Sequence, residues 1–284
     1  MVQPLSTSYL FDPADPRAPS DAQWQQMLPD QRARVVAMLP AEVPFELLPN
    51  EGDPHRKAKQ GALDALDGFF RRTGRKVYLS SELAIFYPAE PRFSPDLIAV
   101  TDVEHHDRMK WVVADEGKGL DFVLEVHVAG DRRKDEKTNV ERYARLGIPE
   151  YFYFDRTRLQ LAAYRLPATP AGAPRARAYQ RLVPQAGRFA SAVLGLDLAL
   201  DGPRLRFFAG NAPLEDKQEV IARLGSMLDK VMAGQQAEAE RLAVELAEEQ
   251  RLRAEEQRLR AEERAEAARE LAEARAEIER LKAR

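Results

Sequence analysis

The clearest pattern of apolar and polar residues in the chain lies between Asp121 and Val128. Every second residue from Phe122 onward is apolar, so these side chains share one face of an extended chain. Glu125 and His127 fall on the opposite face. The alternation predicts a core β-strand in which the side chains of Phe122, Leu124 and Val126 are buried.

Other segments of residues 44–210 carry shorter patterns. Their spacing, with breaks at Gly and Pro, predicts both helices and strands. The predicted helices are His55–Arg72, closed by Gly74, and Lys134–Leu146, closed by Gly147; the predicted strands are Lys76–Tyr87, Pro95–Val103, Trp111–Ala114, Asp121–Val128, Tyr151–Phe154, Leu159–Leu166, Ala178–Val183, Ala192–Leu200 and Leu205–Phe208. This order predicts an α/β fold, in the form of an α+β mixed sheet flanked by helices, with its central sheet over Lys76–Phe154.

The N-terminal part has a different character. Four prolines and no periodicity in residues 1–19 predict a loose arm. Trp24, Met27 and Leu28 recur at helical spacing after a capping residue at position 20 or 21, and a second short helix is predicted at Asp30–Leu39. The predicted divisions of the chain are an N-terminal arm with short helices (1–43), a main domain (44–210) and a C-terminal tail (211–284).

The tail has a helical period from Leu214 onward. Its first apolar face consists of Val220, Leu224, Met227, Leu228, Val231 and Met232. The peptide Glu-Glu-Gln-Arg-Leu-Arg-Ala then occurs at 248–254 and again at 255–261, but the heptad phase breaks after Leu259. The tail is therefore either an isolated helix stabilised by i,i+4 charge pairs or a weak coiled coil that dimerises the protein.

Charge is unevenly distributed between the tail and the rest of the chain. Residues 235–284 carry 14 acidic and 11 basic side chains, which accounts for the whole net charge of −3. Residues 1–234 are formally neutral. This excludes a protein that binds nucleic acid through bulk positive charge, but it leaves a local basic groove open.

The chain contains no cysteine, which excludes disulfide bonds, thiolate zinc sites and a cysteine nucleophile. The absence of cysteine fits the reducing cytoplasm. The first residues lack the basic start and apolar run of a signal peptide, and no apolar stretch reaches the length of about 18 residues that spans a membrane. We therefore expect a soluble, cytoplasmic protein with no membrane partner.

Two carboxylates are candidates for chemistry. Glu125 lies in the middle of a core strand, where a charge is costly unless it is paired or binds a metal ion. Asp96 directly follows Pro95 and opens another buried strand. Carboxylates on neighbouring strands can hold a divalent cation such as Mg²⁺, which polarises a phosphoryl oxygen and activates water. The alternatives are a salt bridge or a solvated face for Glu125 and a strand-opening turn for Asp96.

These segments resemble a known family. The tripeptides around Asp96 and Glu125, together with the run from Arg132 to Asp155, are similar to the Uma-type family of putative restriction endonucleases, part of the PD-(D/E)XK nuclease superfamily. The most specific part is Gly147-Ile-Pro-Glu-Tyr-Phe. The resemblance extends over residues 45–210. It implies a restriction-endonuclease-like core, Mg²⁺ or Mn²⁺ as the cofactor, and cleavage of nucleic acid, with DNA as the expected partner. A coiled-coil tail is a common companion in this family.

The chain departs from the family pattern at the expected lysine. Superfamily members usually carry Lys two residues after the second acid, where this chain has His127. Uma-type sequences often supply the lysine from the next helix, where this chain has Asn139. Lys137 lies at the edge of the inward helix face and can reach inward on its long stem, but a solvated Lys137 fits the pattern equally well. The predicted catalytic set is therefore Asp96, Glu125, Lys137 and His127.

Other polar residues carry weaker signals. His55 opens a helix in a segment, Glu51 to His55, that resembles the family's entry to its first helix, and a structural role competes with an active-site role there. Glu51 is a candidate third acid, but a glutamate in a loop beside Gly and Pro is usually solvated, and the same two alternatives hold for Glu82 in its predicted strand. His105 and the adjacent His106 are expected in a surface loop. Residues 132–134 form a basic cluster that suits either phosphate contact or an ordinary surface turn.

Two functions follow from these observations. The first is a metal-dependent endonuclease that hydrolyses phosphodiester bonds, and it is favoured by the presence of both acids. The second is a catalytically inactive nuclease-fold module that binds nucleic acid or protein and is oligomerised by its tail. The asparagine at position 139 favours this second function.

Overall fold

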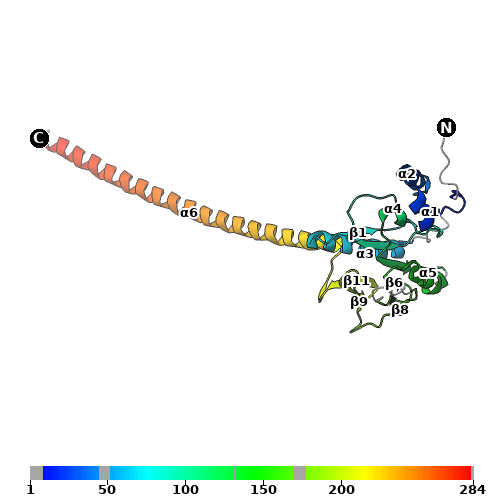
Figure 1. Ribbon diagram of the computed structural model, residues 1–284. Helices are drawn as coiled ribbons and strands as arrows, with labels where there is room; N and C mark the ends of the chain where they lie inside the picture. The colour runs from blue at the N-terminus through cyan, green and yellow to red at the C-terminus, as the bar shows by residue number, and fades with distance from the viewer. Residues whose placement is uncertain (1–8, 45–51, 131, 169–176, 283–284) are drawn as a thin grey trace. The chain divides into compact units, whose positions relative to one another are not determined.

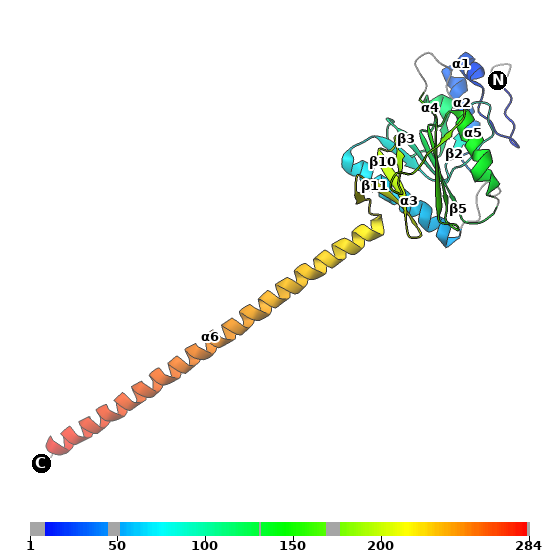
Figure 2. The same cartoon turned by 90° about the horizontal axis from the view of Figure 1, so that it is seen from below.

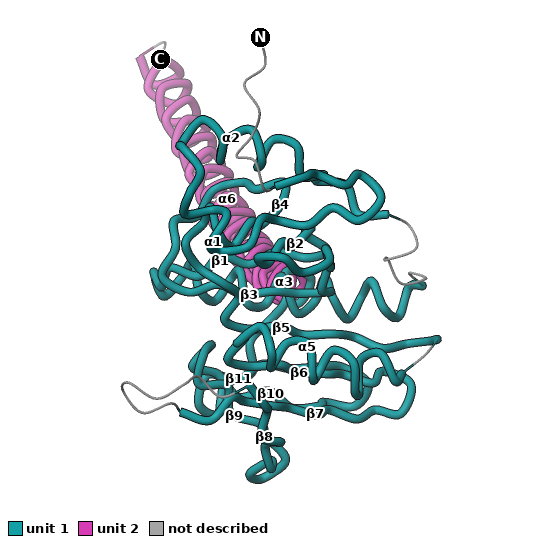
Figure 3. The backbone as a smooth tube through the Cα atoms, turned by 45° about the vertical axis from the view of Figure 1, so that its right-hand side comes forward, with its two compact units in different colours: residues 1–219 teal, residues 220–284 magenta. Residues whose placement is uncertain are grey.

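The structure of the chain is a computed structural model that describes residues 9–44, 52–130, 132–168 and 177–282 (Figure 1). Contacts within the chain divide it into two units, Met1–Glu219 and Val220–Arg284, which Figure 3 distinguishes by colour. The first unit is a mixed α/β structure built on a central sheet. The second consists of the greater part of one long helix.

The central sheet has six strands in the order β1-β3-β5-β6-β7-β8. The strands are β1 (Val77–Ser80), β3 (Leu97–Thr101), β5 (Phe122–His127), β6 (Glu150–Asp155), β7 (Gln160–Arg165) and β8 (Gln180–Arg181). Only the β5–β6 pair is parallel. A parallel pair needs a crossover connection, and the helical segment between these two strands supplies it. The predicted mixed sheet flanked by helices is confirmed.

β5 is buried on both faces. Phe122, Leu124 and Val126 pack with the side chains of α3 (Asp53–Thr73) in one hydrophobic core, which confirms their predicted burial. Val123 points to the opposite face, where it packs with residues of α5 (Asn139–Leu146). Figure 2 shows α3 and α5 on opposite sides of the strands. Both helices end, as predicted, at a glycine with a left-handed backbone: Gly74 has φ 69° and Gly147 has φ 78°.

A second, four-stranded sheet follows in the order β12-β11-β10-β9. Its strands are β9 (Phe189–Ser191), β10 (Leu196–Asp201), β11 (Arg204–Ala209) and β12 (Ala212–Pro213). Leu196, Leu198 and Phe207 from this sheet join the same core as α3. The predicted strands over residues 192–208 are therefore present, although they do not extend the central sheet.

One part of the predicted central sheet is wrong. The run Lys76–Tyr87 is not one strand, because the chain turns at Glu82, which has a left-handed φ of 54°. The second half of the run, β2 (Ala84–Phe86), instead pairs in parallel with β4 (Lys110–Val112) in a separate two-stranded sheet. A short helix, α4 (Val113–Glu116), follows β4 directly.

The two predicted N-terminal helices are present as α1 (Asp21–Gln26) and α2 (Pro29–Met38). Ser20 caps α1 through a capping box with Gln23. Trp24, Val35 and Leu39 pack against β2 and β4. The short helices therefore cover the two-stranded sheet, and the contacts place them in the same unit as the central sheet.

The tail forms α6 (Lys217–Lys282), a single helix of 66 residues with no buried residue. Ion pairs at i,i+4 spacing, such as Arg253 with Glu249 and Arg260 with Glu256, follow its charged surface. The predicted long C-terminal helix is confirmed. Among the described residues, no helix combines the length and the hydrophobicity that a membrane span requires.

Candidate functional site

Asp96 and Glu125 lie opposite one another on neighbouring strands. The antiparallel pairing of β3 with β5 sets Leu97 against Leu124, and the same register places Asp96, one residue before β3, against Glu125. The backbone N–H of Asp96 donates to Glu125 Oε2 at 3.3 Å, and the backbone N–H of Val126 donates to Asp96 Oδ2 at 2.7 Å. The pairing of β3 with β5 thus brings together the two carboxylates that the sequence predicts as candidates for chemistry.

Both carboxylates are withdrawn from solvent. Asp96 is 5% exposed and Glu125 is 6% exposed. Burial, followed by the negative charges of Asp96 and Asp135, raises the pKa of Glu125 well above its ordinary value of 4.5. Desolvation is thus the first cause of the raised pKa of Glu125, and repulsion from Asp96 is the second.

His55 approaches the acid pair from the start of α3. Its Nε2 atom lies 3.2 Å from Asp96 Oδ2, and the imidazole is buried. One turn later, the ammonium group of Lys59 pairs with Glu82 in the turn after β1. α3 thus carries a histidine to the first acid and fixes the turn between β1 and β2. Glu51 lies outside the described residues.

α5 reaches the acid pair from the other side. The hydroxyl of Tyr143 donates to Glu125 Oε1 at 2.6 Å, and Nδ2 of Asn139 lies 3.4 Å from the same oxygen. Asn139 is buried on the face of α5 that meets the acid pair. Burial, followed by the charge of Glu125, raises the pKa of the Tyr143 hydroxyl, so this group donates as a neutral phenol.

The segment before α5 brings a third carboxylate that the sequence analysis did not identify. Lys134–Thr138 forms a π-helix, a wider coil that is frequent at functional sites. Asp135 Oδ1 accepts a hydrogen bond from Asn139 Nδ2 at 3.0 Å, and its Oδ2 lies 3.5 Å from His127 Nδ1. Burial is the first cause of a raised pKa at Asp135, and the charge of Asp96 adds to it. His127 is buried and shares the strand face of Glu125, as predicted.

The π-helix carries two lysines, Lys134 and Lys137, close in sequence to Asp135. The charge of Lys134 lowers the pKa values of both Glu125 and Asp135, opposing the effect of burial. Both lysines are exposed, Lys137 of the predicted catalytic set as well as Lys134. Because Lys134–Thr138 is a π-helix, a wheel drawn with the α-helical period does not give the direction of these side chains.

His105 and His106 lie apart from this cluster. Both are exposed in the segment between β3 and β4, as expected, and His106 Nδ1 contacts the backbone oxygen of Asp107 at 3.1 Å. His105 packs edge-on against Tyr78, with ring centroids 6.2 Å apart. These contacts explain the pair as surface residues.

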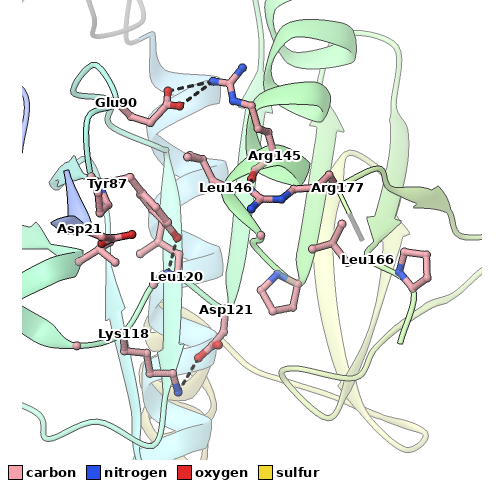
Figure 4. Close-up of a pocket in the computed structure, with 17 residues that line it drawn as sticks. Asp21, Tyr87, Glu90, Lys118, Leu120, Asp121, Arg145, Leu146, Leu166 and Arg177 are labelled. Carbon is pink, nitrogen blue, oxygen red and sulfur yellow. Dashed lines mark hydrogen bonds and ion pairs between the residues drawn. The ribbon is translucent and has the colours of Figure 1, made fainter. Parts of the chain in front are cut away.

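A cavity of about 880 Å³ lies at the opposite end of β5 (Figure 4). Tyr87, Leu120 and Leu146 contribute to its walls, and none of the acids described above lines it. Four of its charged groups form two ion pairs, Glu90 with Arg145 and Lys118 with Asp121, which the dashed lines in Figure 4 mark. The acid cluster and this cavity are therefore separate features of the unit.

The acid pair suits a hard divalent cation. Asp96 Oδ1 accepts no hydrogen bond from any residue in the described parts of the chain, and Glu125 forms no ion pair there. No three His, Asp or Glu side chains of the described residues are grouped so that they could hold a metal ion. Mg²⁺ commonly uses only one or two carboxylates and keeps several waters. The donor set of Asp96 and Glu125 therefore fits such an ion.

Comparison with known proteins identifies the family. The model of Uma2, described as putative restriction endonuclease, matches residues 27–201. The chain belongs to the Uma2 family. The match contains the acid pair, the π-helix and α5, and it also includes α2, which lies before the segment in which the sequence resemblance was recognised.

One solved structure similar to the Uma2 chain is a putative nuclease belonging to DUF820 from Anabaena variabilis ATCC 29413. The two share 12% sequence identity, and the match covers 44% of this chain and 76% of that chain, with a TM-score of 0.35. No curated protein matches the chain.

Proposed function

We propose that this chain is a metal-dependent endonuclease that hydrolyses nucleic-acid phosphodiester bonds. The observation that carries the proposal is the pair of buried carboxylates, Asp96 and Glu125, joined across β3 and β5. Membership of a family described as putative restriction endonucleases supports nucleic acid, and DNA in particular, as the substrate.

In this proposal Asp96 and Glu125 hold Mg²⁺ or Mn²⁺. The bound ion would supply Lewis-acid polarisation of a phosphoryl oxygen and a water of lowered pKa. The chain's own residues orient the ligands: Tyr143 and Asn139 fix one oxygen of Glu125, and His55 contacts Asp96. These contacts hold both carboxylates in position before substrate arrives.

A basic group beside the acids is needed to stabilise the charge that develops on the phosphoryl oxygens. The sequence predicts Lys137 and His127 as the groups that help to activate the attacking water. Lys134 is a further candidate, because it lies in the same π-helix as Asp135 and its positive charge favours the ionised forms of Glu125 and Asp135. His127 is paired with Asp135, which suits it to hold or pass a proton near the acids.

Cleavage of supercoiled plasmid DNA tests the proposal. The wild-type protein is incubated with Mg²⁺, with Mn²⁺ or with EDTA, in parallel with Glu125→Gln. Glu141→Gln is the matched control, because it makes the same change at an exposed position of α5. Nicking by wild type and the control in metal, with none in EDTA or in Glu125→Gln, is the expected result. Equal cleavage by Glu125→Gln would overturn the assignment.

A second candidate is a nuclease-fold module without catalysis. Asn139 and His127 stand where lysine is expected, and this observation favours a protein that binds nucleic acid or a protein partner without cutting. Asn139→Lys separates the two functions, since its ammonium group would be placed beside Glu125 and Asp135. An inactive wild type that gains cleavage through Asn139→Lys supports the module; an active wild type supports the enzyme.

We also propose that α6 joins two copies of the chain. Ile221, Leu224, Leu228 and Val231 follow one another at spacings of three and four residues, and each is more than half exposed. Such spacing suits the seam of a coiled coil. Light scattering on the full chain and on a chain ending at residue 219 tests this: a dimer that becomes a monomer is expected, and a monomeric full chain contradicts it.

A further inference from the structure

The loops beside the acid cluster hold two arginines against one buried carboxylate. Asp155, at the end of β6, is 2% exposed in its side chain. Its Oδ2 atom lies 3.7 Å from Nη1 of Arg132 and 4.0 Å from Nε of Arg158. Arg132 precedes the π-helix, and Arg158 lies in the turn between β6 and β7. Residues from two separate loops are thus drawn to the same point.

This point lies at the end of β5 that carries the proposed catalytic residues. Asp155 pairs with His127 in the β5–β6 register, and the backbone N–H of Arg156 donates to the carbonyl oxygen of His127 at 2.8 Å. Thr157 adds a hydrogen bond from its hydroxyl to the carbonyl oxygen of Val128, at 2.7 Å. The turn that bears Arg158 is therefore hydrogen-bonded to the strand of Glu125 at His127 and Val128, and His127 is two residues from Glu125.

The arrangement leaves positive charge at the surface. The side chains of Arg132 and Arg158 are 36% and 50% exposed, whereas the carboxylate between them is buried. One carboxylate balances only one of two guanidinium charges. Oδ2 of Asp155 accepts no hydrogen bond within the described part of the chain, and neither guanidinium donates one there. The donors of both groups therefore remain open to a ligand.

We propose that Arg132 and Arg158 form a phosphate clamp that binds the backbone of the nucleic acid beside the acid pair. Guanidinium groups match phosphate oxygens in charge and geometry, and contacts of this kind set the position of a duplex without selecting its sequence. Asp155 acts as the positioning residue, because it holds the two arginines together while its own charge stays buried. The clamp rests on the proposed function for its substrate, but its binding can be measured without cleavage.

Salt dependence of DNA binding tests the clamp. Anisotropy of a labelled duplex is measured in EDTA, so that no metal-dependent cleavage occurs, over a series of salt concentrations. Each neutralised phosphate contributes about 0.9 to the slope of log K against log salt for duplex DNA. Arg132→Gln with Arg158→Gln should therefore lower the magnitude of the slope by about 2. The charge-retaining pair Arg132→Lys with Arg158→Lys should keep it.

Arg71→Gln with Arg72→Gln is the matched control. These exposed arginines lie near the end of α3, at roughly 24 Å along the helix from His55, and their loss removes the same charge. An unchanged slope is expected for this control. Thermal melting checks that each variant folds; if the glutamine pair does not, Arg158→Gln alone should lower the slope by about 1.

Several results would overturn the clamp: a wild-type slope in the glutamine pair, a lowered slope in the lysine pair or in the control, or a wild-type protein that binds no duplex at low salt. Failure of the proposed function gives a different result. If wild type cuts no DNA but Arg132→Gln with Arg158→Gln still lowers the salt-dependence slope of binding, the nuclease proposal fails and the clamp stands. If wild type cuts DNA but the double glutamine variant keeps the wild-type slope, only the clamp fails.

Discussion

Asp96 and Glu125 each accept a backbone hydrogen bond from the strand of the other. The N–H of Asp96 points to Glu125 Oε2, and the N–H of Val126, which follows Glu125, points to Asp96 Oδ2. The pairing of β3 with β5 therefore fixes the relative position of the two acids through the backbone. Such a pair is costly when both groups are charged and desolvated, and a bound cation would offset that cost.

Glu125→Gln should stabilise the protein at neutral pH in the absence of metal. The pKa of Glu125 is raised in the folded protein, so the unfolded chain loses this proton at a lower pH, near 4.5. The free energy of unfolding therefore falls as pH rises from 4.5 to the pKa of the folded state. Removal of the ionisable group removes that penalty. We expect a gain of about 1 kcal/mol, or about 2–4 °C in the thermal midpoint.

Melting curves from pH 4 to pH 8 check this expectation. The difference between Glu125→Gln and wild type should be small near pH 4.5 and should grow as pH rises. Glu141→Gln, at an exposed position, should follow wild type throughout. A difference that is largest at low pH would contradict the burial of an uncompensated acid.

Tyr143→Phe should weaken the support of Glu125. The substitution removes the hydroxyl that donates to Glu125 Oε1 at 2.6 Å and leaves the ring in its packing site. A buried acceptor that loses its donor costs about 1–3 kcal/mol. Urea unfolding should show a loss of this size, and it should be smaller in the Glu125→Gln background, where the charge is absent. Equal losses in both backgrounds would show that the hydroxyl acts independently of Glu125.

The strand of Glu125 and the strand-opening position of Asp96 could be predicted from sequence, because alternation and the preceding proline determine which residues face each other. Asp135 could not be predicted in this way. A helical wheel assumes one period, whereas Lys134–Thr138 adopts the wider π-helix before α5 begins. The turn at Glu82 could not be predicted either, because a glutamate with a left-handed backbone does not change the pattern of apolar residues.

Lys134→Met should reduce plasmid cleavage at least tenfold, whereas Lys137→Met should change it little. Lys134 acts electrostatically on Glu125 and Asp135, so its loss removes positive charge from the acids and from the transition state. The two variants lose the same charge from the same π-helix, so each is the control of the other. Initial cleavage rates in Mg²⁺ decide between them, and a larger effect at Lys137 would return the role to that residue.

Deletion of residues 235–284 should leave the thermal midpoint of the α/β unit nearly unchanged. α6 contains no buried residue, and its alternating charges and alanines offer little apolar surface to bury. Calorimetry of the shortened and full chains measures the difference. A loss of more than about 2 kcal/mol, the scale of a truncated core side chain, would show that this segment contributes to the packing of the unit.

Calorimetric titration with Mn²⁺ tests the metal assignment most directly. Wild type and Glu141→Gln should bind the ion with the same affinity, because the acid pair is intact in both. Glu125→Gln should bind it at least tenfold more weakly, since it loses one of two charged ligands and keeps nearly the same side-chain volume. Full Mn²⁺ affinity in a folded Glu125→Gln protein would contradict the account.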